Sequence, residues 1–112
     1  MRYNTTKEEP ELTPTRKTEY FNKWIIGLRD KEARRRILAR ITRLRLGNPG
    51  DHKDFGDISE LRIDYGPGYR VYYARQGTML IILLAGGMKA RQDRDFKTAR
   101  ELLALVRKET GR

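Results

Sequence analysis

Residues 60–73 have the sequence ELRIDYGPGYRVYY, in which two runs of alternating side chains flank the tripeptide Gly-Pro-Gly. Alternation with a period of two predicts β-strands, because successive strand residues point to opposite faces of a sheet. The glycines supply the positive φ angles of a tight turn. We therefore predict a hairpin of strands Ser59–Tyr65 and Tyr69–Arg75. Its core side carries Leu61, Ile63 and Val71. Its other, exposed side carries Glu60, Arg62, Asp64, Arg70 and Tyr72.

A third strand and a helix are predicted after the hairpin. The strand Thr78–Ala85 contains the continuously apolar run MLIILLA, which is typical of a central strand covered on both faces. Gly86 and Gly87 are expected to end it. The last helix, at about Asp93–Arg107, carries five apolar residues at helical spacing.

Before the hairpin, the sequence predicts an edge strand, two helices and a loop. The strand spans Thr13–Thr18, and Thr18 then caps a helix over Glu19–Leu28. Asp30 caps a second helix that stops at Gly47, and the following GNPGDHKDFGD is expected to be a loop. The element order β-α-α-β-β-β-α predicts an α+β domain with helices packed on a small, mostly antiparallel sheet.

The composition limits the class of protein and its partners. The 112 residues fit one compact domain, residues 1–112, whose polar first twelve residues are expected to be a flexible lead-in. The net charge of +10 attracts polyanions, so nucleic acid, the ribosome or an acidic protein segment are natural partners, although the same charge can simply maintain solubility. The absence of Cys excludes disulfides and thiolate metal sites. The longest apolar run is too short to span a bilayer and the polar N-terminus is unlike a signal peptide, so a soluble cytoplasmic protein is expected.

Basic residues form a stripe on the second predicted helix. At about 100° per residue, Arg36, Arg40 and Arg43 lie together beside the apolar face. Such a stripe suits a phosphate backbone or an acidic partner helix, and the alternative is an ordinary solvated face. We include Lys53 and Arg91 with these arginines as candidate RNA- or ribosome-binding residues.

The exposed side of the hairpin has residues suited to RNA cleavage. Attack by the 2′-hydroxyl requires a proton acceptor, stabilisation of the charged phosphate, and a proton donor for the leaving oxygen. Arg62 and Arg70 suit the phosphate, because guanidinium groups bind its oxygens in pairs. Tyr72 can stack on a base, and Lys89, just after the third strand, can donate a proton or form a second clamp. His52 is the single histidine, and the acid and base stay open among His52, Lys89 and Tyr72. No metal-ligand spacing or Ser-His-Asp pattern is present.

Four segments resemble those of RelE/ParE-superfamily toxins, most closely the HigB-like branch of addiction module killer proteins. They are FNKWIIGLRD, ARRRILARITRLRLGNPGDHKDFGD, ELRIDYGPGYRVYY and LLAGGMKARQDRDFKTARELL, in the family's order and spacing from about Thr18 to Leu103. The resemblance implies a RelE-like fold and growth arrest by cleavage of mRNA on the ribosome without metal or organic cofactor. It also implies a toxin–antitoxin hetero-oligomer with a HigA-like helix-turn-helix antitoxin.

The resemblance also assigns residues. Arg70 matches the phosphate-binding arginine of the GYR motif, Arg62 falls near the basic positions of the preceding strand, and Lys89 matches the basic residue after the last strand. Phe96 stands where RelE has a tyrosine, which implies a different general acid. Two other functions stay open at this point: a ParE-like inhibitor of DNA gyrase, and a non-catalytic nucleic-acid-binding module.

Overall fold

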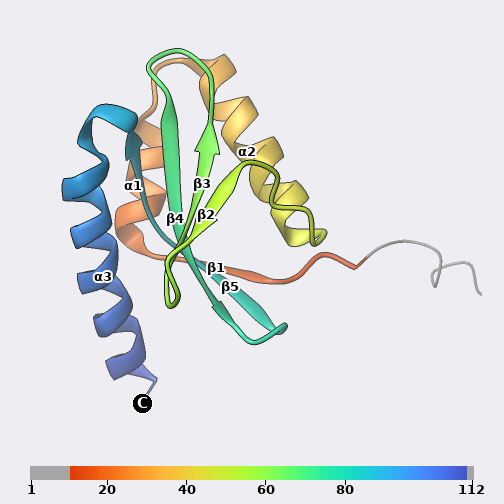
Figure 1. Ribbon diagram of the computed structural model, residues 1–112, viewed down its shortest axis with the longest axis vertical. Helices are drawn as coiled ribbons and strands as arrows, with labels where there is room; N and C mark the ends of the chain where they lie inside the picture. The colour runs from red at the N-terminus through yellow and green to blue at the C-terminus, as the bar shows by residue number, and fades with distance from the viewer. Residues whose placement is uncertain (1–10, 111–112) are drawn as a thin grey trace, which may run out of the picture.

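A five-stranded sheet forms the centre of the computed structural model, which describes residues 11–110 (Figure 1). The strands lie in the order β1-β5-β4-β3-β2; β1 pairs with β5 in parallel, and the other neighbours are antiparallel. The mixed α+β class and the mostly antiparallel sheet are therefore confirmed. The strands are β1 (Thr15–Lys17), β2 (His52–Asp54), β3 (Ser59–Ile63), β4 (Tyr69–Gln76) and β5 (Leu80–Met88).

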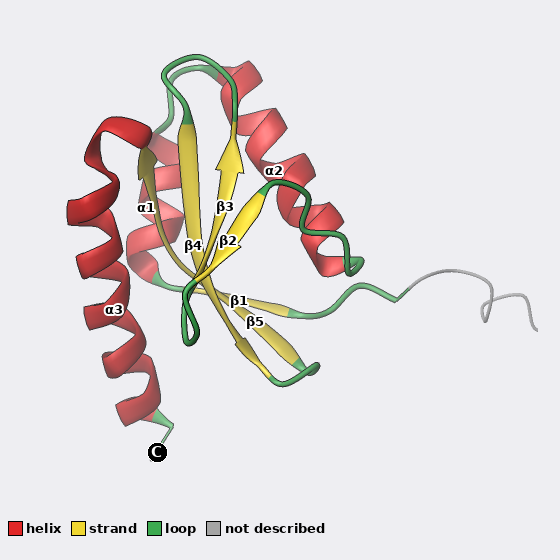
Figure 2. Cartoon of the chain, in the orientation of Figure 1, coloured by secondary structure: helices red, strands yellow, loops and turns green. Residues whose placement is uncertain are grey.

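Helices cover both faces of this sheet (Figure 2). The helices are α1 (Glu19–Gly27), α2 (Lys31–Arg45) and α3 (Gln92–Glu109), and a 3-10 turn, η2 (Lys89–Arg91), precedes α3. Helices α1 and α2 bury Phe21, Ile37 and Leu44 against one face, whereas α3 buries Ala99 and Leu103 against the other. The chain therefore has three layers, and neither face of the central strands is left entirely to solvent.

The predicted helix caps are present. The Thr18 side chain accepts a hydrogen bond from the backbone N–H of Phe21 at 3.0 Å, and Asp30 accepts one from that of Ala33 at 3.1 Å. Each bond satisfies a backbone donor that the first helical turn leaves free. Gly47 has a φ of 92° just beyond α2, a conformation that stops the helix and favours glycine.

The polar side of the hairpin was expected to be exposed, and this expectation is wrong for much of its length. Helix α3 packs on it, so that Tyr72 is 0% exposed and Glu60 only 4%. The alternation of side chains was read correctly, but the polar side is a second buried layer along part of its length. Arg62, beside the first turn of α3, stays partly open to solvent, and Asp64 is exposed as expected.

One strand was not predicted, and the ends of others differ from the predictions. The expected loop after α2 contains β2, whose three residues pair with β3 although all are exposed and show no alternation. Strand β5 runs through both glycines to Met88, and β1 is limited to Thr15–Lys17. Of the expected flexible lead-in, residues 1–10 lie outside the described residues. No helix within residues 11–110 is both long and apolar enough to cross a membrane.

Candidate functional site

Two rows of paired residues cross the sheet beneath the start of α3. Arg62 pairs with Arg70, which in turn pairs with Gly87 of β5. In the neighbouring row, Lys53 pairs with Glu60, and Glu60 pairs with Tyr72. Directly paired residues share a face of the sheet, so the hairpin places these side chains together.

A buried carboxylate lies between the two arginines. Arg62 donates from Nε to Oε1 of Glu60 at 2.9 Å, and Nε of Arg70 lies 3.8 Å from the same oxygen. Side-chain exposure is 35% for Arg62, 11% for Arg70 and 5% for Glu60. Glu60 therefore holds Arg62 by its Nε edge, and Arg62 is the more accessible of the two cations.

Arg70 is incompletely bonded. Its Nη1 donates to the carbonyl oxygen of Tyr69 at 3.3 Å, but its Nε is buried without a hydrogen-bond partner among the described residues. An unmet buried donor of this kind costs about 1–3 kcal/mol. The site thus contains a mostly buried cation whose hydrogen-bonding capacity is only partly used.

Lys89 is placed beside this row by the hairpin turn. Its backbone N–H donates to the carbonyl oxygen of Gly68 at 2.9 Å, and a Cβ added to Gly68 would lie 3.2 Å from Cβ of Lys89. Gly68 also has a φ of 81°, so both its space and its conformation favour glycine. We call Lys53, Arg62, Arg70 and Lys89 the cationic face.

A depression of about 270 Å³ opens beside Arg62 at the first turn of α3. Phe55 and Phe96 line it, with ring centroids 4.9 Å apart, and Nζ of Lys53 lies 5.1 Å from the centroid of Phe55. Neither ring was expected in the site from the sequence. The residue Phe96 was noted only as a departure from the family pattern, and Phe55 lies in a segment expected to be loop.

The structure does not support base stacking by Tyr72. Its ring is fully buried against Phe96, and its hydroxyl donates to the carbonyl oxygen of Gln92 at 3.3 Å. Burial, reinforced by the Glu60 carboxylate, raises the pKa of Tyr72 well above its ordinary value. Tyr72 is therefore a neutral side chain of the α3-side core.

His52 lies on the opposite face from Arg70. It pairs with Leu61, which is buried in the core beneath α1 and α2, whereas Arg70 belongs to the α3 side. The His52 ring is exposed, and its Nδ1 lies 2.8 Å from the carbonyl oxygen of Gly50. The structure thus separates His52 from the cationic face.

The arginine stripe on α2 lies on the other face of the sheet from the cationic face, and Arg40 is already bonded. Its guanidinium donates to three backbone carbonyls, those of Arg62 at 2.7 Å, Pro49 at 2.8 Å and Asp51 at 2.9 Å. Burial lowers the pKa of Arg40 from its ordinary value. Arg40 thus has a structural role that was not predicted, because it ties the loop and β3 to α2, and phosphate binding by Arg40 stays a prediction.

The other two members of the stripe differ from Arg40. Arg36 pairs with Glu32 at 2.9 Å and lies over the ring of Tyr65, 4.5 Å from its centroid. Arg43 is exposed. Both lie on the α1–α2 side of the sheet. A partner bound at the cationic face would therefore need a second contact, on the opposite face, to reach them.

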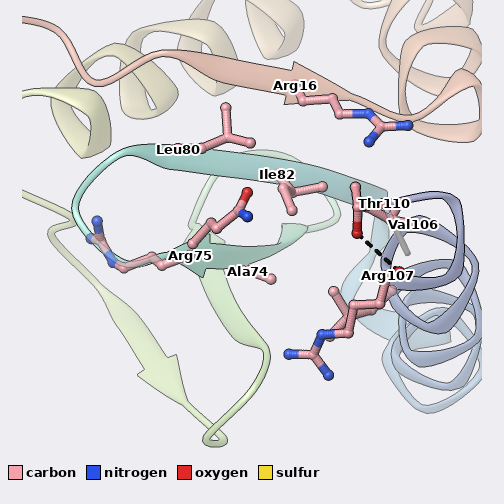
Figure 3. A pocket seen from close by; sticks show the side chains of 10 residues that line it. Arg16, Ala74, Arg75, Leu80, Ile82, Val106, Arg107 and Thr110 are labelled. Atoms are coloured by element: carbon pink, nitrogen blue, oxygen red, sulfur yellow. Dashed lines mark hydrogen bonds between the residues drawn. The ribbon is translucent and has the colours of Figure 1, made fainter. Parts of the chain in front are cut away.

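Another depression, of about 210 Å³, lies at the far end of α3 (Figure 3). Its apolar floor includes Leu80, Ile82 and Val106, and the side chains of Arg75 and Arg107 stand at its rim. None of the predicted site residues lines it. Within residues 11–110, moreover, no three His, Asp or Glu side chains gather as a metal-binding group.

These features define a small basic α+β protein with a cationic face beside a helix. A family model described as Phage derived protein Gp49-like (DUF891) matches residues 23–110, and the chain belongs to this Gp49-like family. It is a family of the addiction-module toxin type, and membership implies a toxin–antitoxin system with an antitoxin partner.

An uncharacterized protein of Haemophilus influenzae (strain ATCC 51907 / DSM 11121 / KW20 / Rd) is 51% identical over 83 residues. The match covers 73% of this chain and 84% of that protein. No solved structure matches the chain. The toxin class expected from the motifs is thus confirmed, whereas the HigB-like branch and the RelE-like fold stay predictions.

Proposed function

We propose that this protein is the toxin of a type II toxin–antitoxin pair and that it cleaves mRNA on the ribosome. A helix-turn-helix antitoxin would neutralise it. The observation that carries the proposal is the pairing of Arg62 with Arg70 around one buried carboxylate, with Lys53 and Lys89 on either side. The net charge of +10 and membership of the Gp49-like family support the same class of target.

The cationic face suits the charged phosphate of the transition state. Fixed cations lower the barrier where charge develops, and a preorganised donor needs no reorganisation during the reaction. Glu60 acts as a positioning residue, because it holds Arg62 by Nε. Arg70, paired with Arg62 and 11% exposed, gives the phosphate a second cation, and the exposed Lys89 is the candidate to protonate the leaving 5′-oxygen.

Cleavage can be tested by inducing the protein without its antitoxin and mapping new RNA 5′ ends. We expect growth arrest with new ends for the wild type, and a loss of cleavage rate of about 100-fold for Arg62→Ala, as for removal of one transition-state donor. Arg107→Ala, at the far end of α3, is the matched control and should cut normally. Growth arrest with intact mRNA would overturn the proposal, and a loss of DNA supercoiling in those cells would indicate gyrase as the target. Tolerated induction of soluble protein would instead favour a non-catalytic module.

The buried and remote candidates are expected to be dispensable for chemistry. Tyr72→Phe removes a hydroxyl that is bonded to Gln92, and His52→Ala alters the other face of the sheet. Both variants should retain RNA cleavage, measured as the abundance of new 5′ ends at equal amounts of soluble toxin. If either variant abolished cleavage while staying folded by circular dichroism, the assignment of chemistry to the cationic face would be wrong.

A further inference from the structure

A third depression, with a largely apolar lining that also carries charged groups, lies next to the cationic face. It has a volume of about 480 Å³ and opens between α1, the end of β5 and the start of α3. Its walls carry two aromatic side chains, three cations and one buried carboxylate. They are Tyr20, Trp24, Lys23, Arg91, Arg94 and Asp95. We call it the α1–α3 pocket.

Two glycines allow the aromatic and the carboxylate to reach the backbone of β5. A Cβ on Gly86 would lie 2.1 Å from the Trp24 ring, and a Cβ on Gly87 would lie 1.9 Å from Oδ2 of Asp95. Real side chains do not approach this closely, so any other residue would displace Trp24 or Asp95. The Gly-Gly pair thus places an indole and a carboxylate on opposite faces of β5, and both line the pocket at the edge of the strand that β1 leaves unpaired.

Asp95 retains acceptor capacity although it is buried. Its side chain is 3% exposed, and the guanidinium of Arg94 lies 3.6 Å from its Oδ1, which is beyond hydrogen-bond distance. An ionised carboxylate can accept about four hydrogen bonds. A ligand that offers N–H donors to Asp95 would therefore be bound favourably.

This combination of groups matches one nucleotide. Unpaired bases are recognised by stacking on aromatic side chains and by hydrogen bonds to their Watson–Crick edge, while Lys and Arg bind the phosphates. Guanine is the base that offers two adjacent N–H groups, at N1 and N2, and these match the two oxygens of a carboxylate. Tyr20 and Trp24 lie one turn apart on α1 and supply the apolar surface.

The pocket adjoins the cationic face along β5. Gly87, which lines the pocket, pairs directly with Arg70, and Lys89 follows two residues later. We propose that the α1–α3 pocket binds a guanine base of single-stranded RNA, so that a neighbouring phosphate reaches Arg70 and Lys89. This inference rests on the proposed function, because it assigns a base preference to the same RNA-cleaving site.

Trp24 gives a direct measurement, since it is the single tryptophan of the chain. Purified toxin is titrated with GMP, CMP and UMP while indole fluorescence is recorded. We expect saturable quenching by GMP at lower concentration than by CMP or UMP. Equal responses to all three nucleotides, or none, would overturn the proposal whatever the activity of the protein.

Asp95→Asn tests the carboxylate, with the exposed α3 residue Glu101→Gln as the matched control. Loss of a two-bond base contact is expected to weaken GMP binding about 5- to 150-fold, and to leave UMP binding and the control unchanged. Thermal unfolding of each variant shows whether it is folded. If the Asp95→Asn protein does not fold, the titrations of the wild type with GMP, CMP and UMP decide the question.

Maps of the cleavage positions distinguish refutation of the guanine-binding proposal from refutation of the RNA-cleavage proposal. If both proposals hold, wild-type cuts show a guanine at a fixed offset, and Asp95→Asn disperses the cuts without abolishing them. Cuts without a guanine preference would refute the pocket alone. GMP-specific quenching by a protein that cuts no RNA would refute the nuclease and leave a guanine-binding site.

Discussion

Replacing Arg40 is expected to destabilise the protein rather than weaken a contact to RNA. In Arg40→Met the aliphatic stem is kept, but the three hydrogen bonds to the carbonyls of Arg62, Pro49 and Asp51 are lost. The bonds to Arg62 and Pro49 are partly buried and are worth about 1.5 kcal/mol each at the low end for a charged donor. The exposed bond to Asp51 adds little, because water replaces it.

The Nε group of Arg40 offsets part of this loss of stability when it is removed. Its Nε is buried without a partner among the described residues, so removing it recovers about 1 kcal/mol. The net loss in the free energy of unfolding is therefore about 2 kcal/mol. With a denaturant slope of about 2 kcal/mol per molar urea, the midpoint should fall by about 1 M.

Arg43→Met, one turn away on the same helix, is the control for this measurement. Arg43 is exposed, and a surface substitution of this kind changes stability by less than about 0.5 kcal/mol. Urea unfolding followed by circular dichroism compares the two variants. The reasoning is refuted if Arg40→Met unfolds within 0.2 M of the wild type, a margin of about 0.4 kcal/mol. Refutation also follows if both variants lose stability equally.

Two further predictions concern packing and pH. Gly86→Ala should lower the free energy of unfolding by about 1–3 kcal/mol and shift the fluorescence of Trp24, because the added Cβ meets the indole. Gly27→Ala is the control: an added Cβ there has nothing within 4 Å, so the same thermal melts should show a neutral or stabilising change. Hydrogen bonds from Arg35 and then Arg36 lower the pKa of Glu32 to about 2. The stabilising effect of Glu32 is thus complete above its ordinary pKa of 4.5 and is lost as the pH falls through about 2. Carboxyl NMR should show that midpoint, and Arg35→Ala should raise it; a wild-type midpoint near 4.5 would contradict the assignment.

Much of the candidate site was predictable from the hairpin sequence. The alternation in residues 60–73 placed Glu60, Arg62 and Arg70 on one side of two paired strands, which the observed register confirms. The sequence placed Lys89 only after the third strand; its contact with Gly68 at the turn follows from the extension of β5 to Met88. The aromatic pair beside Arg62 was not predictable, because Phe55 and Phe96 are 41 positions apart and meet only when α3 packs on the sheet.

The sequence by itself determined the local elements: the strands and turn of residues 60–73, the caps at Thr18 and Asp30, and the apolar stripes of the helices. These depend on short-range periodicity and on hydrogen bonds within a few residues. The tertiary structure alone decided which polar side chains meet solvent, because alternation identifies two faces of a sheet and does not say what covers each. In the folded chain Tyr72 is buried under α3, His52 lies on the other face from Arg70, and Arg40 donates to three backbone carbonyls. The Gly-Gly pair was expected to end a strand, but both glycines pair with β4, and Trp24 and Asp95 occupy the space that their missing side chains leave.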